Sequence, residues 1–409
     1  MHQNPYITLL IVGITFIGIA VGRYPIIRSN RTTIALMGVA LLVLTKQIHF
    51  NQISSYLDFN TLILLFSMMI LNANLKFSGF FNLASKALIH YAKTPRFFLA
   101  VEILLVGFLS ALFLNDTICL MFTPLILSLM EKLKRNPIPY LIALAMASNV
   151  GSTATLTGNP QNMIVGVASG LSYLEFAMAL TPIALLGLVV IWWVLVKTYT
   201  FEFMQPFPPA TEIDSETETS KPTLIKTSVI ILGMLIAMLL GVPVSLAAFL
   251  AANGLLITRR YQPHMVFAEF DWSLLVFFGS LFVVSGSLET SGAMNLIFEP
   301  EIWIDRIQIW NLSLISGVLS NLVSNVPAVL LLKPVVLMMS DARLGWLTLA
   351  ASSTLAGNLT LLGSVANLIV AESAARWRVN LSFWEYTKTG IIITVITLVI
   401  SIAWLTWIV

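Results

Sequence analysis

The sequence has 409 residues, of which 58% are hydrophobic and only 10% are charged, and its mean hydropathy is +0.91. Soluble domains carry about 25% charged residues, so this composition excludes a soluble globular protein and predicts that lipid surrounds much of the chain. The net charge of +3 is small, and the single cysteine excludes a disulfide framework. The four histidines all lie outside the apolar runs, which argues against a histidine-rich metal site.

Apolar runs that are long enough to cross a bilayer, about 17–25 residues, occur in both halves of the chain. In chain order they lie near 6–22, 32–48, 59–76, 138–168, 178–197, 224–241, 243–258, 272–290, 344–371 and 389–408. The first run has no basic segment before it, so we expect a retained spanning helix rather than a signal peptide. Two longer apolar runs, 97–132 and 308–340, need a different topology.

The distribution of lysine and arginine predicts the orientation in the membrane. If the loop with Arg23, Arg28 and Arg31 is cytoplasmic, 18 of the 22 basic residues fall on cytoplasmic segments. This holds only if the run 97–132, which has basic residues at both ends, enters and leaves the membrane on the same face. We therefore predict a re-entrant hairpin there, a second one at 308–340 from the opposite face, and extracytoplasmic termini.

The polar segment 201–223 is rich in proline, threonine and acidic residues and is predicted to be a flexible cytoplasmic linker. It divides the chain into a first half, residues 1–200, and a second half, residues 224–409. Each half is predicted to contain one hairpin, at 97–132 and 308–340.

Parts of the two halves are similar in sequence. SNVGSTATLTGNPQNMIV (148–165) aligns without gaps to STLAGNLTLLGSVANLIV (353–370), with seven identities in 18 positions. LNDTICLMFTP (114–124) pairs with SNVPAVLLLKP (324–334), and FNTLILLFSMMI (59–70) resembles FDWSLLVFFGSL (270–281). The predicted topology runs the two members of the last pair in opposite directions. We therefore expect inverted-topology repeats, which are typical of secondary transporters.

Both repeats contain a sequence that breaks a membrane helix. In the run 138–168 we expect a break at Gly158-Asn159-Pro160, because proline removes a hydrogen-bond donor and clashes with the preceding turn. In the run 344–371 we expect a gentler break at Gly363-Ser364. A broken helix offers free N–H groups to anions and free C=O groups to cations, although Asn and Gly can also simply assist helix packing. The candidate binding residues at the two breaks are Thr157, Gly158, Asn159, Pro160, Asn162, Gly363, Ser364 and Asn367.

The predicted hairpin tips carry polar residues at mid-membrane: Asn115, Asp116 and Thr117 in the first tip, Ser324 and Asn325 in the second. Asn, Asp, Ser and Thr cap helix ends, and capping explains part of this pattern. It does not explain the acid, because a carboxylate at this depth costs several kcal/mol unless it is paired or hydrated. Asp116 is therefore a candidate proton carrier or cation ligand.

Lys333 lies within the second predicted hairpin. It could neutralise an anionic solute, replace a cation in that half of the chain, or pair with Asp116. The alternative is that it extends its ammonium group toward the outer face, as lysines near membrane surfaces do.

The segment GNPQN after SNVGSTAT, together with AGNLTLLGSVANLIVAES in the second half, resembles the ion transporter superfamily across essentially the whole chain. That superfamily includes divalent anion–sodium symporters, citrate carriers, arsenite efflux permeases and silicic acid exporters. The Asn115-Asp116 tip looks closer to the arsenite-permease and bacterial anion-permease branch. The resemblance implies a homodimer with a scaffold and an elevator-like transport domain. It also implies solute and coupling-ion binding at the tips and breaks, with a possible sodium near Asn115, Asp116 and Gly158.

Together these patterns predict an all-α polytopic membrane protein with about ten transmembrane helices, two re-entrant hairpins and broken helices in two inverted repeats. We expect an ion-coupled secondary active transporter for a small anion or oxyanion-type solute, driven by a proton or sodium gradient. The alternatives are a cation/proton antiporter and an arsenite- or silicate-type efflux permease. No enzymatic activity, cofactor or nucleic-acid partner is expected, and the predicted location is the plasma (inner) membrane.

Overall fold

The computed structural model describes residues 4–21, 30–90, 94–207, 221–257, 262–297 and 308–408. The described residues form helices and loops and contain no strand, which confirms the predicted all-α class. Six of the described helices are long and apolar enough to cross a membrane: Phe59–Ser78, Pro95–Leu112, Tyr173–Thr198, Lys221–Leu239, Trp272–Thr290 and Phe383–Trp407. The total number of spans and the inverted repeat stay predictions.

The helices of the first half follow the predicted runs closely. In chain order they are α1 (Pro5–Val21), α2 (Arg31–Leu44), the 3₁₀ turn η1 (Phe50–Gln52), α3 (Ile53–Tyr56), α4 (Phe59–Ser78), α5 (Phe80–His90), α6 (Pro95–Leu112), α7 (Asn115–Lys132), α8 (Ile138–Ser152), α9 (Pro160–Ser169), α10 (Tyr173–Thr198) and α11 (Thr200–Met204).

The second half has a similar order of elements. Its helices are α12 (Lys221–Leu239), α13 (Val244–Leu256), α14 (Pro263–Ala268), α15 (Trp272–Thr290), α16 (Met294–Ile297), α18 (Ile309–Val323), α19 (Asn325–Leu337), α20 (Ala342–Ala356), α21 (Val365–Arg376) and α22 (Phe383–Trp407).

The predicted linker 201–223 is shorter in the structure than in the sequence-based prediction. Its first residues belong to α11, where Phe203 is buried and packs edge-to-face on Tyr140 with ring centroids 5.7 Å apart. Its last residues begin α12, and residues 208–220 lie outside the described ranges, as do Arg23 and Arg28. The helices on either side therefore extend into both ends of the predicted linker, and a buried side chain lies at each end, Phe203 in α11 and Thr223 in α12.

The two helix breaks have different local causes. Between α8 and α9 the chain leaves the helix over residues 153–159, and Pro160 then occupies the first turn of α9, where its missing N–H costs nothing. Asn159 caps α9, because its Oδ1 accepts from the backbone N–H of Asn162 at 2.8 Å. Between α20 and α21 there is no proline, and Ser364 provides the cap by accepting from the backbone N–H of Ala366 at 3.3 Å.

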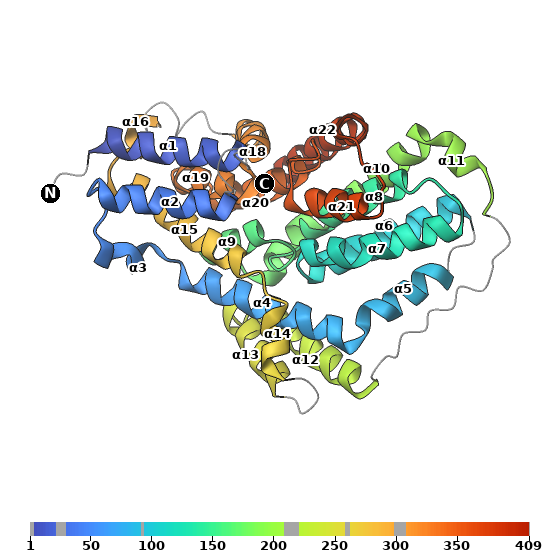
Figure 1. Cartoon of the computed structure of the whole chain (residues 1–409). Coiled ribbons are helices and arrows are strands. Elements are labelled where there is room, and N and C mark those ends of the chain that lie inside the picture. Colours follow the sequence, from blue (N-terminus) through green and yellow to red (C-terminus); the bar gives the residue numbers. More distant parts are fainter. Residues whose placement is uncertain are drawn as a thin grey trace.

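Helices from the two halves pack against each other. Figure 1 shows α1 and α2 together at the left and α12 and α13 at the bottom, and α2 packs on α15 while α4 packs on α13. Beyond the breaks, α9 packs on α19 and α20, and α21 packs on α7 and α8. Each half therefore needs the other to complete its core, and the two breaks lie close together inside the molecule.

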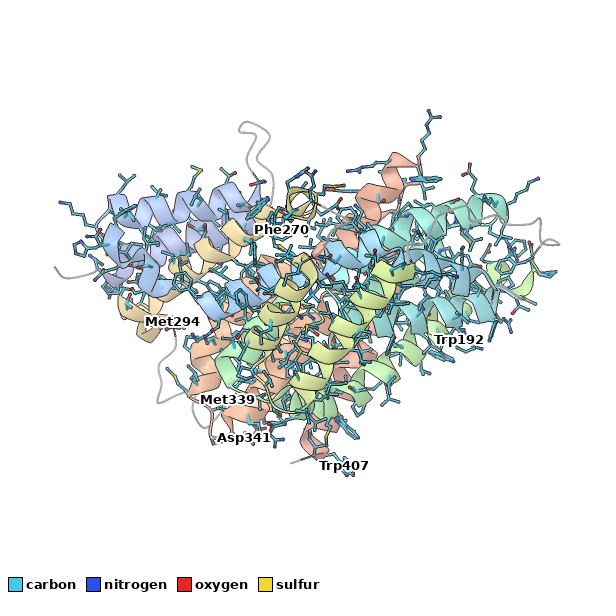
Figure 2. All side chains as sticks on the ribbon, turned by 90° about the horizontal axis from the view of Figure 1, so that it is seen from below. Trp192, Phe270, Met294, Met339, Asp341 and Trp407 are labelled. Atoms are coloured by element: carbon cyan, nitrogen blue, oxygen red, sulfur yellow. The ribbon has the colours of Figure 1, made fainter. Side chains whose placement is uncertain are left out.

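The outer surface is apolar, as a lipid environment requires. Along α12 the exposed side chains recur every three or four residues: Ile225, Val229, Leu232 and Ile236. In Figure 2 Phe270 lies near the centre of the molecule and Trp407 lies at its edge, and their exposed fractions are 8% and 75%. The exposed face of α12 is therefore one that lipid tails can solvate.

Candidate functional site

Each hairpin tip lies against the helix break of its own half. In the first half, the backbone N–H of Asn115 donates to the carbonyl of Gly158 at 3.0 Å. In the second half, Asn325 takes the corresponding place. When its amide is oriented to satisfy both of its ends, Nδ2 donates to the carbonyl of Gly363 at 3.2 Å. Tip and break therefore form one polar unit in each half.

In each break, one asparagine side chain donates hydrogen bonds to backbone carbonyls of the interrupted helix. Asn162 donates from Nδ2 to the backbone carbonyls seven and ten residues before it, at 2.9 and 3.0 Å. Asn367 donates from Nδ2 to the carbonyls seven and ten residues before it, at 3.1 and 2.8 Å. These bonds satisfy carbonyls that the interrupted helices leave without partners. The two predicted site residues thus shape the breaks and are fully buried behind the cavity described below.

Asn149 joins the two halves and was not predicted from the sequence. Its Nδ2 donates to Oδ1 of Asn358 at 2.8 Å and to Oδ1 of Asn367 at 2.9 Å. Its Oδ1 accepts from Nδ2 of Asn115 at 3.1 Å and from Oγ of Ser364 at 3.0 Å. The amide of Asn149 thus donates two hydrogen bonds and accepts two. It links the first tip, α8 and the second break.

A cavity of about 140 Å³ lies in front of these units. It is lined by six of the predicted site residues: Asn115, Asp116, Pro160, Ser324, Asn325 and Ser364. Thr157, Gly158, Asn159 and Gly363 are buried in the layer behind them and do not line the cavity. The predicted residues thus divide into a group that faces the cavity and a group that supports it.

The four helices that follow the two tips and the two breaks begin at this cavity. α7 begins at Asn115, α9 at Pro160, α19 at Asn325 and α21 at Val365, and all four residues line the cavity. The N-terminus of a helix carries free N–H groups and a partial positive charge, so the arrangement favours oxygen atoms that accept hydrogen bonds. Ser324 at the second tip has a φ of +80°, a strained backbone conformation for a residue other than glycine, and such strain is common at binding sites.

The opposite wall of the cavity comes from α2 and α15 and was also missed. Arg31 and Thr32 lie at the start of α2, and Asp271 and Ser273 at the start of α15. The Thr32 and Ser273 hydroxyls are 2.7 Å apart and join the two helices. In the sequence these residues stand at the polar ends of apolar runs, where they read as helix caps and loop charges. The cavity lining thus contains one guanidinium and two carboxylates, those of Asp116 and Asp271.

A second cavity of about 180 Å³ adjoins the first, and both share Asp116 and Asp271. Thr117, a predicted site residue, lines this second cavity and accepts from Nδ2 of Asn72 at 3.1 Å. Lys76 at the end of α4 forms an ion pair with Glu269 across its wall, with 2.6 Å between Nζ and Oε2. We call this cavity the first vestibule, because it leads from the shared residues to the end of α4.

Lys333 does not lie at this site. It lines a separate cavity of about 440 Å³ with Asp58 and Glu289. The hypothesis that Lys333 pairs with Asp116 is wrong, because the two side chains line different cavities. Helix α19 places Lys333 away from the tip of the hairpin α18–α19.

The backbone of Gly158 packs closely against the backbone of Ser152 and Ser110, which leaves no room for a side chain. A Cβ at this position would lie 2.4 Å from the Ser152 carbonyl oxygen and 2.8 Å from that of Ser110, and neither backbone can move aside easily. We expect Gly158→Ala to destabilise the protein by about 3 kcal/mol. The midpoint of unfolding in increasing SDS measures this loss. Gly233→Ala is the control, because a Cβ there meets no atom within 4 Å. Equal midpoints for the two variants would contradict the described packing.

Residues 16–350 match the family model described as a citrate transporter, which covers more than half of the chain. The chain belongs to this family. The predicted resemblance to the ion transporter superfamily is therefore confirmed. The chain is a membrane transporter rather than an enzyme.

Curated relatives cover nearly the full length. The chain is 30% identical to the silicon efflux transporter LSI3 of Oryza sativa subsp. japonica, over 92% of this chain and 93% of the relative. It is 29% identical to a 46 kDa membrane protein of Mycobacterium leprae (91% and 93%) and 25% identical to the putative transporter arsB of Dictyostelium discoideum (98% and 92%). Among solved structures, the YdaH transporter of Alcanivorax borkumensis has the same fold, with a TM-score of 0.63, 14% identity and coverage of 98% and 97%.

Proposed function

We propose that this protein is an ion-coupled secondary active transporter that moves a small oxyanion, or the hydroxylated acid from which it derives, by alternating access. The observation that carries the proposal is the convergence of four helix N-termini on one cavity, between two hairpin tips and two helix breaks. Oxygen atoms of a solute would accept hydrogen bonds from these N-termini. The relative named as a silicon efflux transporter supports the same solute class.

The charges around the cavity favour a solute with little negative charge. Asp116 and Asp271 face it together with a single cationic side chain, Arg31. A tricarboxylate would meet two like charges there, which costs several kcal/mol. A hydroxylated oxyacid can donate hydrogen bonds to the carboxylates and accept them from the N-termini. Small size and hydroxyl groups, rather than high charge, are therefore what we expect the site to select.

Asp116 is the proposed site of ion coupling. No basic side chain in the described ranges forms an ion pair with it. A carboxylate at membrane depth is stabilised by binding a proton or a cation. Sodium would find further oxygen ligands nearby, because Oδ1 of the buried Asn115 has no hydrogen-bond partner among the described residues. We infer that either ion binds at the first tip together with the solute.

A cation/proton antiporter is the second candidate. The observation that favours it is the presence of two carboxylates, Asp116 and Asp271, on one cavity. In that case the cation and the proton would compete for the same oxygen atoms. Sodium-driven proton release from liposomes, followed with a pH-sensitive dye and without any oxyanion present, would favour this candidate over the first.

Transport assays with a panel of candidate solutes test the proposal directly. The protein is reconstituted in liposomes and presented with arsenite, silicate, sulfate, phosphate, succinate and citrate under separate proton and sodium gradients. We expect accumulation of silicate or arsenite under one of the gradients, and little movement of citrate. Protein-free liposomes are the control. Citrate accumulation without movement of either hydroxylated acid would overturn the assigned solute class.

We further infer a homodimer in the plasma (inner) membrane with both termini extracytoplasmic. The ends of α2 and α4 that carry Arg31 and Lys76 would face the cytoplasmic side. The basic residues of the loops and the resemblance to the superfamily support this arrangement. Mass photometry of the detergent-purified protein tests the dimer. Protease protection of a tag at either terminus in intact cells tests the orientation.

A further inference from the structure

The cavity around Lys333 lies at the opposite end of the molecule's central helices from the first vestibule. Tyr56 and Asp58, just before α4, line it together with Glu289 near the end of α15. The first vestibule is lined by the other end of α4, at Lys76, and by the start of α15. α4 has 20 residues, and a helix of that length spans about 30 Å. The two cavities therefore lie at opposite ends of a helix that is long enough to cross a membrane.

The linings of these two cavities correspond residue by residue. Asp58 caps α4 by accepting from the Thr61 N–H at 3.1 Å, and Asp271 caps α15 by accepting from the Leu274 N–H at 3.0 Å. Aligning the caps relates the helices by 213 positions, the difference between 271 and 58. This register differs by two positions from the sequence comparison of 59–70 with 270–281. The structural caps are the better guide, because both begin a helix in the same way.

In this register, residues of the first vestibule have their equivalents in the cavity around Lys333. The pairs, with the first-vestibule residue given first, are Met69 and Phe282, Asn72 and Ser285, Ala73 and Gly286, Lys76 and Glu289, Glu269 and Tyr56, and Asp271 and Asp58. Such a set of pairs is expected if the two cavities are related by the inverted repeat. We call the cavity around Lys333 the second vestibule.

The charges of the second vestibule are arranged differently from those of the first. Lys76 of α4, which pairs with Glu269, is replaced by Glu289, and Glu269 is replaced by Tyr56. The cation of the second vestibule is instead Lys333 on hairpin helix α19. In the described ranges Lys333 forms no ion pair, although Asp58 and Glu289 line the same cavity. Its ammonium group is therefore available to a solute.

We propose that the second vestibule is the access route to the transport site from the opposite membrane face, and that Lys333 makes it select solutes with negatively charged or hydroxyl oxygens. The inference rests on the proposed transport function for its purpose. Its test does not require that any solute be moved, so a failure of the solute panel and a failure here are distinguishable. The native Cys119 is fully buried, so an introduced cysteine provides the reactive thiol.

The first arm of the experiment tests the sidedness. Ser285→Cys reports on the second vestibule and Ala73→Cys on the first. Membrane-impermeant thiol reagents are added to one side of oriented membrane vesicles at a time. We expect each cysteine to be labelled from one side only, and the two from opposite sides. Labelling of both from the same side would overturn the assignment of a second access route.

The second arm tests Lys333 with two thiosulfonate reagents of opposite charge. In the Ser285→Cys protein, the ratio of the labelling rates by the anionic and the cationic reagent reports the local potential. One unit charge that lines the same partly hydrated cavity changes such a ratio about tenfold. Lys333→Gln should therefore lower the ratio about tenfold, and Lys333→Arg should preserve it. Glu289→Gln should raise the ratio, and Lys76→Gln should leave it unchanged. An unchanged ratio in Lys333→Gln would sink the proposed role of this lysine.

Discussion

We expect Asp116→Asn to abolish gradient-driven accumulation of the solute while solute exchange across the membrane continues. Each unit of pH gradient coupled to one proton can sustain about a tenfold accumulation ratio, because one pH unit corresponds to about 1.4 kcal/mol. An amide of the same shape cannot take up this proton, nor provide the negative charge that a sodium ion needs. The measurement is the internal solute concentration in proteoliposomes at steady state, compared with exchange of labelled solute without a gradient.

The fold should tolerate this change. Asp116 lies in the first turn of α7 and no ion pair of its side chain is found in the described ranges. The unfolding midpoint of Asp116→Asn in SDS should therefore match that of the unmodified protein. A lost accumulation ratio together with a lower midpoint would indicate damage to the structure rather than loss of coupling.

Asp271→Asn is the matched control. Asp271 lines the same cavity, and asparagine caps helices as well as aspartate does. Asp271 caps α15 and lies outside the tips and breaks, so we expect its neutral variant to retain accumulation. If Asp271→Asn loses accumulation and Asp116→Asn keeps it, the coupling group has been assigned to the wrong carboxylate.

The helical class could be predicted because it depends on local chemistry. Long apolar runs in a chain with few charges have one simple solution in lipid, which is the helix. The interruption at Pro160 follows from the covalent structure of proline. In the second half no proline marks the start of α21, and the hydroxyl cap of Ser364 provides a weaker signal. Comparison with the first half was what located that position.

The opposite wall of the cavity could not be predicted, because it depends on packing between distant segments. Thr32 and Ser273 are separated by 241 residues and meet only because α2 packs on α15. Arg31 and Asp271 are brought to the site by the same contact. Lys333 shows the converse, since it is close in sequence to the second tip and yet lines another cavity. The position of Lys333 along α19 places it away from the tip, and the sequence does not show which way its side chain points.

Asn149→Ala is expected to have the largest effect on stability. Asn149 is 1% exposed, and its amide bonds to the first tip and to the second break. Alanine leaves Nδ2 of Asn115 and the Oδ1 atoms of Asn358 and Asn367 without this partner. A buried polar group without a partner costs about 1–3 kcal/mol, so we expect a loss of about 4 kcal/mol in total. Transport should also be lost, because the tip and the break would no longer be held together.

Asn74→Ala separates this linking role from the general cost of removing a buried asparagine. Asn74 is 3% exposed, and its Nδ2 donates to the carbonyl of Ile70 at 2.8 Å within the same helix. The loss of one local bond should lower stability by about 1 kcal/mol, with transport retained. SDS unfolding midpoints and solute exchange are measured for both variants. Equal losses in the two would mean that Asn149 contributes only as a buried polar side chain. A selective loss in Asn149→Ala would indicate that one amide couples the two halves at the transport site.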